Sequence, residues 1–503
     1  MAKSLPLTAR RRACGAVPVI WTANISRENA FKAAINELRQ MPFLKNKEVF
    51  IAAFFLLVFS STSLSYWLLD YSWLEQQRIT QLMLLVAASA ALQLGYWRRP
   101  GAFVPPNNTV LLAFILGLAS ALLSQHPQWA LKEWAKYASS FALIVYLGHL
   151  LRQAAAQQVV LFILFVTSAL LAVQFLAFYI ASFFTGTRDV NPYLMYPGFD
   201  NPRFYGQFQI ILIPILHGLS LQQGWHKKLF NQNAIQLTLL LQWCIVWALA
   251  GRGVLLGLCI ASVATLLATG VRYKALLLQA VAFALAGLAL YFLLFFCFPE
   301  WAGLARDTPS GLRFDLSKRD VLWQGAWKMI KANPFLGVGP LHYSAVWNHI
   351  GAHPHQATLQ FLAEWGIPAT LLFLFSIITG MLRGASIIRN NTDVLDAALW
   401  MALLASLTLA QVDGVFAMPY TEGWLAVIAG LALARWRSPS GAAAMNSPIR
   451  QGMFFVLLLL AITIIGRILI LDVPVLHETS MKFYKEHGIG SPPRFWDQGW
   501  IPM

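Results

Sequence analysis

The feature that most constrains this chain of 503 residues is a close succession of long apolar runs. A helix needs roughly 17–25 residues to cross the hydrocarbon core of a bilayer, and about thirteen runs meet or approach that length. They lie at residues 49–69, 79–96, 108–124, 131–151, 158–183, 204–221, 234–250, 254–270, 275–298, 357–382, 394–411, 423–434 and 453–471. The run at 423–434 is short unless it begins nearer Pro419.

The overall composition points to the same class of protein. Hydrophobic residues make up 58% of the chain and charged residues only 12%, so the apolar runs exceed what one soluble core can bury. We therefore predict an all-α, polytopic integral membrane protein with about 12–13 transmembrane helices.

The placement of basic residues predicts the orientation of these helices. A net charge of +16 could indicate a nucleic-acid partner, but Lys and Arg gather in short segments between the apolar runs, which is the bias that orients membrane helices. With a cytoplasmic N-terminus, the inner loops receive Arg98, Arg99, Arg152, Lys227, Lys228, Arg272, Lys274, Arg383, Arg389, Arg435 and Arg437. The outer loops after residues 69, 124 and 411 are poor in Lys and Arg. We therefore expect a lipid bilayer as the surroundings and no nucleic-acid partner.

This orientation also predicts how the chain is divided. We expect a basic cytoplasmic extension at 1–48, nine transmembrane helices within 49–298, a long outer loop at 299–356 before the tenth helix, the remaining helices within 357–471 and an outer tail at 472–503. Residues 14–21 are too short and too polar for the core of a signal peptide, and Met41 is a candidate start. The four cysteines are scattered, so we expect neither a metal site nor a disulfide framework from them.

One stretch, 323–368, has features that packing inside a bilayer does not require. It begins as an amphipathic helix, breaks at Asn333-Pro334, and continues through a glycine-rich turn and a polar loop with four histidines into an apolar helix near Gln356. A neutral imidazole at the boundary between water and membrane can accept a proton near pH 7. His355 stands at that boundary and is therefore the candidate catalytic residue.

The neighbouring residues allow other interpretations. His353 and His355 could bind a metal together, but no carboxylate or cysteine cluster stands near them in sequence, so we predict no metal. Glu364, in the following helix, is either an ion partner or a polar core residue. The aromatic residues of the stretch either line a glycan- or lipid-binding cleft or anchor the chain at the membrane surface, which is the commoner case; they are Trp323, Trp327, Phe335 and Tyr343.

Two arginines fall on the outer face, against the usual charge bias. Arg203 stands where an outer loop enters a helix, where a long basic side chain can also simply reach the lipid headgroups. Arg252 stands between Gly251 and Gly253; the glycines allow a tight turn between helices but do not explain the arginine. A guanidinium binds phosphate with two parallel, charge-assisted hydrogen bonds. Both arginines therefore indicate an anionic partner.

The segment 319–368 resembles the signature region of the O-antigen ligase and O-antigen polymerase superfamily, which also holds bacterial O-linked protein oligosaccharyltransferases. The ligase pattern is His, then Asn, Ser or Gln, nine residues, Gly, two residues, and Gly, Thr or Tyr. Here His355-Gln356 is followed at that spacing by Gly366, while Ala369 departs from the last position. Because Ala is small, we expect the close helix packing implied there to survive.

Two further motifs carry the resemblance. The turn at 333–339, with Pro334, Gly337 and Gly339, is similar to the family's Pro-x-x-Gly-x-Gly turn. Gly251-Arg252-Gly253 is similar to its Ser-Arg-Gly turn, with glycine in place of the serine. Arg203 matches a less specific outer-loop arginine. The resemblance covers roughly residues 49–434 and is most specific around His355.

The resemblance implies a glycosyltransferase of the bacterial inner membrane that works without metal or cofactor. Such enzymes take a glycan from undecaprenyl diphosphate on the periplasmic side and pass it to an acceptor hydroxyl. Arg203 and Arg252 would hold the diphosphate, with Arg319 as a further anion contact, and His355 would take the proton of the acceptor. The acceptor would be a lipid A core sugar, the end of a growing O-antigen or a Ser/Thr of a pilin-like protein.

Two other classes of function remain open. A transporter or flippase would also be polytopic, but it should carry ionisable residues at mid-membrane, which most of these runs lack; Arg467 is an exception. A structural membrane protein would not need a histidine and arginines on one face. The tail at 472–503 either helps to select the acceptor or docks on the bilayer.

Overall fold

The computed structural model describes residues 46–68, 70–98, 107–184, 189–196, 198–222, 231–306, 318–436, 447–487 and 492–501. The chain divides into two compact units, Met1–Phe50 and Ile51–Met503. The predicted basic extension therefore lies outside the described residues apart from its last three, as do the predicted inner-loop residues Arg99, Lys227, Lys228 and Arg437.

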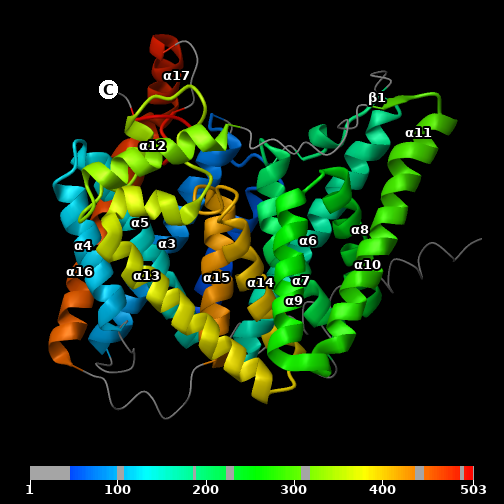
Figure 1. Ribbon diagram of the computed structural model, residues 1–503, viewed down its shortest axis with the longest axis horizontal. Coiled ribbons are helices and arrows are strands. Elements are labelled where there is room, and N and C mark those ends of the chain that lie inside the picture. Colours follow the sequence, from blue (N-terminus) through cyan, green and yellow to red (C-terminus); the bar gives the residue numbers. More distant parts are fainter. Residues whose placement is uncertain are drawn as a thin grey trace, which may run out of the picture. The chain divides into compact units, whose positions relative to one another are not determined.

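Helices make up most of the described structure (Figure 1). The helices before the long predicted loop are α2 (Lys47–Ser61), α3 (Trp73–Arg98), α4 (Asn108–Leu122), α5 (Pro127–Leu150), α6 (Ala154–Ser182), η2 (Pro192–Leu194), α7 (Pro202–Leu221), α8 (Gln232–Ala248), α9 (Arg252–Thr269), η3 (Gly270–Tyr273), α10 (Lys274–Phe292), the π-helical turn η4 (Leu293–Cys297) and α11 (Phe298–Trp301). The later helices are α12 (Arg319–Ala332), η5 (His342–Ala345), α13 (Ala357–Asn390), α14 (Val394–Leu409), α15 (Pro419–Trp436), α16 (Pro448–Arg467), the π-helical turn η7 (Ile468–Asp472), η8 (Val473–Val475) and α17 (Leu476–His487). Two short strands, β1 (Asp189–Val190) and β2 (Ala305–Arg306), pair in parallel.

Each predicted apolar run coincides with a helix, and the prediction of an all-α polytopic membrane protein is confirmed. By length and composition, 6 helical stretches of the described residues could cross a membrane, and one of them, Arg252–Trp301, contains both α9 and α10. Helices α4 and α14 are shorter apolar helices. Helix α5 carries Lys132, Glu133 and Lys136 within its length, which lowers its hydropathy.

Two boundaries differ from the predicted runs for local reasons. Helix α2 ends at Ser61, before the predicted end at residue 69. The hydroxyls of Ser60 and Ser61 donate to carbonyls of the preceding turn, and Thr62 does the same; such bonds compete with helix continuation. Helix α15 begins at Pro419, so the run that looked short in the sequence is a full helix.

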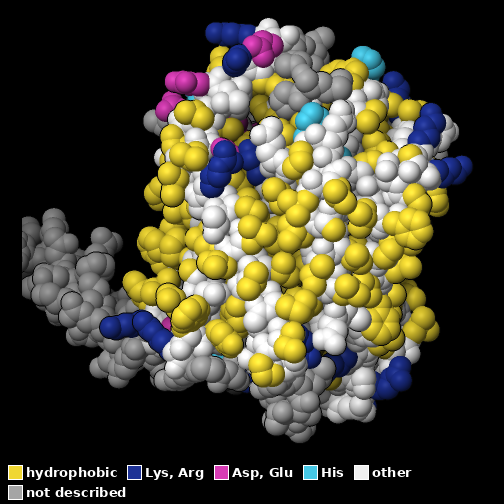
Figure 2. All heavy atoms as spheres, turned by 90° about the vertical axis from the view of Figure 1, so that its left-hand side faces the viewer, with side chains coloured by type: hydrophobic (Ala, Val, Ile, Leu, Met, Phe, Trp, Pro, Cys, Tyr) yellow, Lys and Arg dark blue, Asp and Glu magenta, His cyan; other side chains and the backbone are white. Residues whose placement is uncertain are grey.

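The surface has the polarity of a protein embedded in lipid. Figure 2 shows a broad band of hydrophobic side chains on one face, with charged side chains gathered at both of its ends. Large apolar residues of α13 and α16 lie exposed on the surface, among them Leu371, Phe375, Val456 and Leu459. A soluble monomer rarely exposes so much contiguous apolar surface, whereas a bilayer would cover it.

Three helices in the second unit approach one another closely enough to bring their ends together. A Cβ atom on Gly257 of α9 would lie 2.5 Å from Ile210 of α7 and 2.9 Å from a backbone oxygen of α14. A Cβ on Gly218 of α7 would lie 2.7 Å from Ala398 of α14. This packing brings the first residues of α7 and α9 and the last residues of α14 to the same end of the unit, where α12 and α17 also lie (Figure 1). We call it the α12 end.

Helix α12 packs on α13 through a small core of its own. Leu322, Ala326 and Ile330 of α12 pack against Ala363 of α13 and against Tyr343. Tyr343 lies in the polar loop with four histidines, residues 340–356, which we call the histidine loop. Since these side chains are at most 5% exposed, the polar loop between the two helices is held by a hydrophobic base.

Candidate active site

The glycine-rich turn after α12 docks into a kink of α13. The amides of Val338 and Gly339 donate hydrogen bonds to backbone carbonyls of α13 at 2.9 and 3.0 Å. At the kink, Gly366 has φ 80° and ψ 168°, and a Cβ there would lie 2.2 Å from the carbonyl oxygen of Phe335. Only glycine adopts this conformation without strain. The spacing from His355 to Gly366 thus fixes the distance from the loop to the kink.

The residue after His355 ties two helices together. The side chain of Gln356 caps the start of α13 by accepting a hydrogen bond from the amide of Leu359. Its amide nitrogen donates to Gln411 at 3.0 Å, just beyond the end of α14. His355 itself has φ 52°, an uncommon backbone conformation that such surroundings can maintain. The start of α13 is therefore fixed against the end of α14. Ala369, at the last motif position, is fully buried, as expected for close packing.

His353 and His355 occupy different environments. His355 is 25% exposed, and its Nδ1 lies 3.6 Å from Oδ1 of Asp413. His353 is only 4% exposed and packs against Gly414, where a Cβ would lie 2.4 Å from the imidazole. The amide of His355 donates to Nδ1 of His353 at 3.3 Å. His353 therefore supports the loop, while His355 is the more exposed of the two histidines.

The two neighbours of His355, which are His353 and Asp413, also differ in their electrostatic surroundings. Burial lowers the pKa of His353 well below its usual value, and the nearby His355, Arg494 and Arg319 lower it more, so this ring stays neutral. Burial alone would raise the pKa of Asp413, but His355, the amide of Gly414 and the charge of Arg203 lower it below its usual value. Asp413 is thus a carboxylate at neutral pH, placed to stabilise a protonated His355.

The three predicted arginines each stand in the first turn of a helix. Arg203 is the second residue of α7, and Arg252 and Arg319 are the first residues of α9 and α12. The pKa of Arg319 is lowered by burial and by the positive charges of Arg203 and Arg252, while Asp413 opposes this effect. The structure therefore brings all three arginines and Asp413 into one electrostatic neighbourhood. Among the described residues, neither Arg203 nor Arg252 has an ion-pair partner, and both are exposed.

The predicted aromatic residues take two different places. The indole nitrogen of Trp323 donates to the carbonyl of Pro354 at 3.1 Å, and the hydroxyl of Tyr343 donates to the carbonyl of Leu322 at 2.9 Å. Both residues therefore brace the histidine loop against α12. Trp327 and Phe335 are exposed.

Glu364 is an ion partner, and its partner comes from the tail. Its Oε1 lies 2.8 Å from Arg494, and both side chains are at most 2% exposed. The same oxygen accepts a hydrogen bond from the amide of Tyr343 at 3.0 Å. Neither Asp413 nor Arg494 was predicted from the sequence. The only signal for Asp413 was its place in a loop predicted on the outer face, and Arg494 had none.

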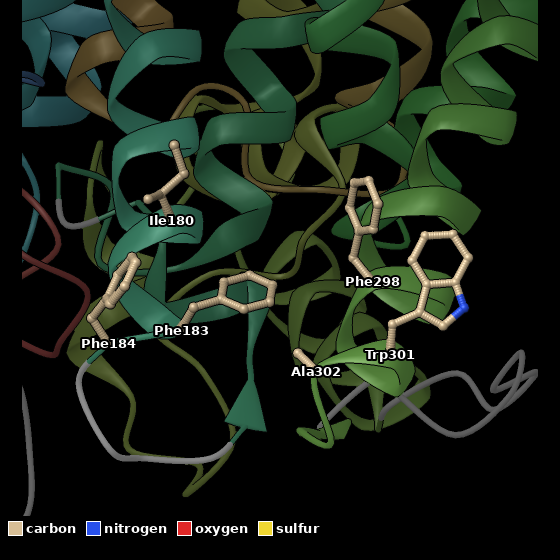
Figure 3. Close-up of a pocket in the computed structure, with 6 residues that line it drawn as sticks. All are labelled: Ile180, Phe183, Phe184, Phe298, Trp301 and Ala302. Atoms are coloured by element: carbon tan, nitrogen blue, oxygen red, sulfur yellow. The ribbon is translucent and has the colours of Figure 1, made fainter.

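An apolar pocket lies apart from these residues, near the ends of α6 and α11. Its volume is about 510 Å³ and it is lined by Ile180, Phe183, Phe184, Phe298, Trp301 and Ala302 (Figure 3). Figure 3 shows the rings of Phe183 and Phe184, which follow the end of α6, on one side and those of Phe298 and Trp301 on the other. The lining suits a hydrocarbon chain and offers no group for proton transfer or phosphate binding. Among the described residues, no group of 3 or more His, Cys, Asp or Glu is arranged to hold a metal ion.

Comparison with known proteins identifies the central region. Residues 237–374 match the family model described as O-Antigen ligase, and this range includes Arg252, Arg319 and His355. No curated protein matches the chain. The match agrees with the resemblance of the signature stretch and with the kink that Gly366 forms. Residues 237–374 of this chain are therefore a domain of the O-antigen ligase family.

Proposed function

We propose that this protein is a membrane glycosyltransferase of the O-antigen ligase type. It transfers a glycan from undecaprenyl diphosphate to an acceptor hydroxyl on the periplasmic face of the bacterial inner membrane, and it needs neither metal nor cofactor. The observation that carries the proposal is the grouping of Arg203, Arg252 and Arg319 with the His355–Asp413 pair at the α12 end. Residues 237–374 match a family whose members transfer glycans, and this match supports the same reaction class.

The arginines would bind the diphosphate of the donor. Each guanidinium can form paired hydrogen bonds to phosphate oxygens, and each stands at a helix N-terminus, where unpaired amides and the helix dipole also favour anions. Arg203 and Arg252 are exposed and without an acidic partner among the described residues, so their charge remains available. As the diphosphate leaves, these groups would offset the negative charge on its oxygen.

His355 would act as the general base. As the acceptor oxygen attacks the anomeric carbon, its proton passes to Nε2 of His355, because Nδ1 faces Asp413. The bond between the anomeric carbon and the phosphate oxygen breaks, and undecaprenyl diphosphate leaves with that electron pair. Asp413 would hold the ring in place and stabilise the imidazolium that forms.

The orientation follows from the distribution of basic residues. At the end opposite α12, Arg435 lies 2.6 Å from both Asp393 and Asp396, and Arg272 of the predicted inner loops donates to the carbonyls of Arg389 and Asn391. The bias of Lys and Arg toward cytoplasmic loops then supports a periplasmic α12 end.

One observation could favour a transporter instead of a glycosyltransferase. Charged residues of α3, α5 and α15 are buried, which often indicates an ion pathway. Here they satisfy one another, because Lys136 lies 2.7 Å from Glu422 and 3.0 Å from Glu133, and Arg78 also pairs with Glu422. A network closed in this way is a structural ion cluster, and it requires no transported ion.

A deletion strain tests the proposed function and identifies the acceptor. We expect lipid-linked glycan to accumulate and one transferred product to disappear. The loss would affect O-antigen on lipid A core for a ligase, long O-antigen chains for a polymerase, or a glycosylated pilin-like protein for an oligosaccharyltransferase. We expect the lipid A core product to be lost. Unchanged glycolipid and glycoprotein profiles, with no accumulated donor, would contradict the proposal.

A further inference from the structure

We propose that the C-terminal segment 492–501 is part of the active site, and that Arg494 is a positioning residue for the loop that carries His355. This inference rests on the proposed function and adds a residue that lies outside the family match. The segment follows α17, which lies at the α12 end (Figure 1).

The first observation is the buried contact of Arg494 with both sides of the loop. Its guanidinium lies 2.8 Å from Glu364 on α13, just before the kink at Gly366. A second nitrogen of the same guanidinium donates to the carbonyl of Ala352 at 3.4 Å, immediately before His353. One rigid, planar group thus connects the helix that follows His355 to the backbone that precedes it.

The second observation is an independent attachment at the end of the segment. The amide of Ile501 donates to the carbonyl of Ser344 at 2.9 Å. The hydroxyl of Ser344 in turn donates to the carbonyl of Ala352 at 3.0 Å. The ring of Trp500 also lies against Trp347, with centroids 4.1 Å apart. The segment therefore contacts the histidine loop near the segment's start, through Arg494, and near its end, through Trp500 and Ile501.

The third observation is that the segment is anchored on its other side. Nε of Arg78, on α3, donates to the carbonyl of Phe495 at 2.7 Å, and the Phe495 side chain is fully buried. Within the segment, the amide of Arg494 donates to the carbonyl of Gly499 at 2.8 Å. A tail that only rested on the bilayer would not need buried polar contacts of this kind. The segment instead packs between α3 and the histidine loop.

Removal of the Arg494 guanidinium should misplace His355 without affecting donor binding. Glu364 would be left as a buried charge without its partner, which is strongly unfavourable, and the carbonyl of Ala352 would lose one of its two donors, keeping only the hydroxyl of Ser344. The loop would then relax away from the geometry that His355 needs. The three arginines that bind the donor belong to α7, α9 and α12, to which Arg494 makes no hydrogen bond among the described residues.

The test compares Arg494→Gln with Arg494→Lys and with Lys482→Gln. Lys482 is a matched control because it is a cation of the same tail but 74% exposed on α17. In a transfer assay with purified protein and varied donor, we expect Arg494→Gln to lower kcat at least about tenfold with KM for the donor changed less than about twofold. Arg494→Lys should recover part of kcat, because it restores the ion pair alone, and Lys482→Gln should match the wild type.

A second measurement does not depend on activity. Ala352 is 1% exposed, so a cysteine placed there, in a chain whose four natural cysteines are replaced, should react slowly with a maleimide. We expect Arg494→Gln to raise this labelling rate at least about fivefold, and Lys482→Gln to leave it unchanged. Solubility and elution as a single species show that the variant has folded.

The outcomes separate this inference from the proposed function. If the wild type transfers no lipid-linked glycan, the proposed function fails, while the labelling result still reports on the role of Arg494. If the wild type is active and Arg494→Gln retains its kcat and its slow labelling, the inference is wrong. A rise in donor KM with an unchanged kcat would also contradict it, because Arg494 would then act on donor binding.

Discussion

Replacement of Asp413 by Asn removes one charge from beside His355 with almost no change in shape. The two groups lie 3.6 Å apart and are 14% and 25% exposed. At that distance an effective dielectric of about 20 gives about 4–5 kcal/mol, and partial access of water reduces this to about 1–2 kcal/mol. Because the imidazolium forms in the transition state, we expect kcat to fall about 5- to 30-fold.

The assay measures initial rates of glycan transfer at varied donor concentration. Asp472→Asn is the control, since Asp472 also lies at the α12 end and pairs with a lysine at 2.8 Å. The lowered pKa of Asp413 means that its charge is present above its usual titration range and is lost only as pH falls through the lower folded value. Asp413 should therefore be charged throughout the range from about pH 5.5 to 8, and the rates of the wild type and of Asp413→Asn are compared at a single pH near the upper end of that range. An Asp413→Asn variant within twofold of the wild type would refute the role assigned to this carboxylate.

Three further predictions concern the donor site, the kink and the orientation. Arg252→Lys should lose most activity because an ammonium cannot reproduce the paired hydrogen bonds of a guanidinium; a native rate at normal expression would make Arg252 a structural residue only. Gly366→Ala should lower the midpoint of thermal unfolding, because a side chain there has a strained φ that costs about 1–3 kcal/mol and clashes with Phe335. Gly380→Ala on the same helix should not lower it, because the space around Gly380 is open. A cysteine at position 252 should react with impermeant reagent from the periplasm, and labelling only from the cytoplasm would overturn the orientation.

The helices could be predicted from the sequence because a bilayer allows few alternatives. A chain in lipid must satisfy its backbone hydrogen bonds internally, so a long apolar run becomes a helix. The motif around His355 was equally local. The spacing to Gly366 and the turn at Gly337 belong to one continuous stretch, and the contacts between them form within that stretch. The end of α2 shifted because hydroxyls near Ser61 compete for backbone carbonyls, which an apolar run does not reveal.

The partners of the site residues could not be predicted, because each comes from a distant part of the chain. Arg494 and Glu364 are 130 residues apart, and Arg78 and Glu422 are 344 apart. A single polar residue in a loop has no periodicity that reveals which group it will meet. Asp413 therefore looked like an ordinary loop residue, and the tail looked like a surface segment. Only the folded chain, in which the C-terminal segment contacts both α3 and α13, shows these contacts.

The central claim is that His355 is the base of a metal-independent glycan transfer. It is tested most directly by assaying purified His355→Ala and His353→Ala with lipid-linked donor and acceptor, in the presence of a chelator. We predict a 10²–10⁴-fold loss for His355→Ala, the usual cost of removing a general base, and near-native transfer for His353→Ala once its folding is confirmed. Full activity of the His355→Ala protein would contradict the claim, and loss of wild-type activity with chelator would indicate a metal instead.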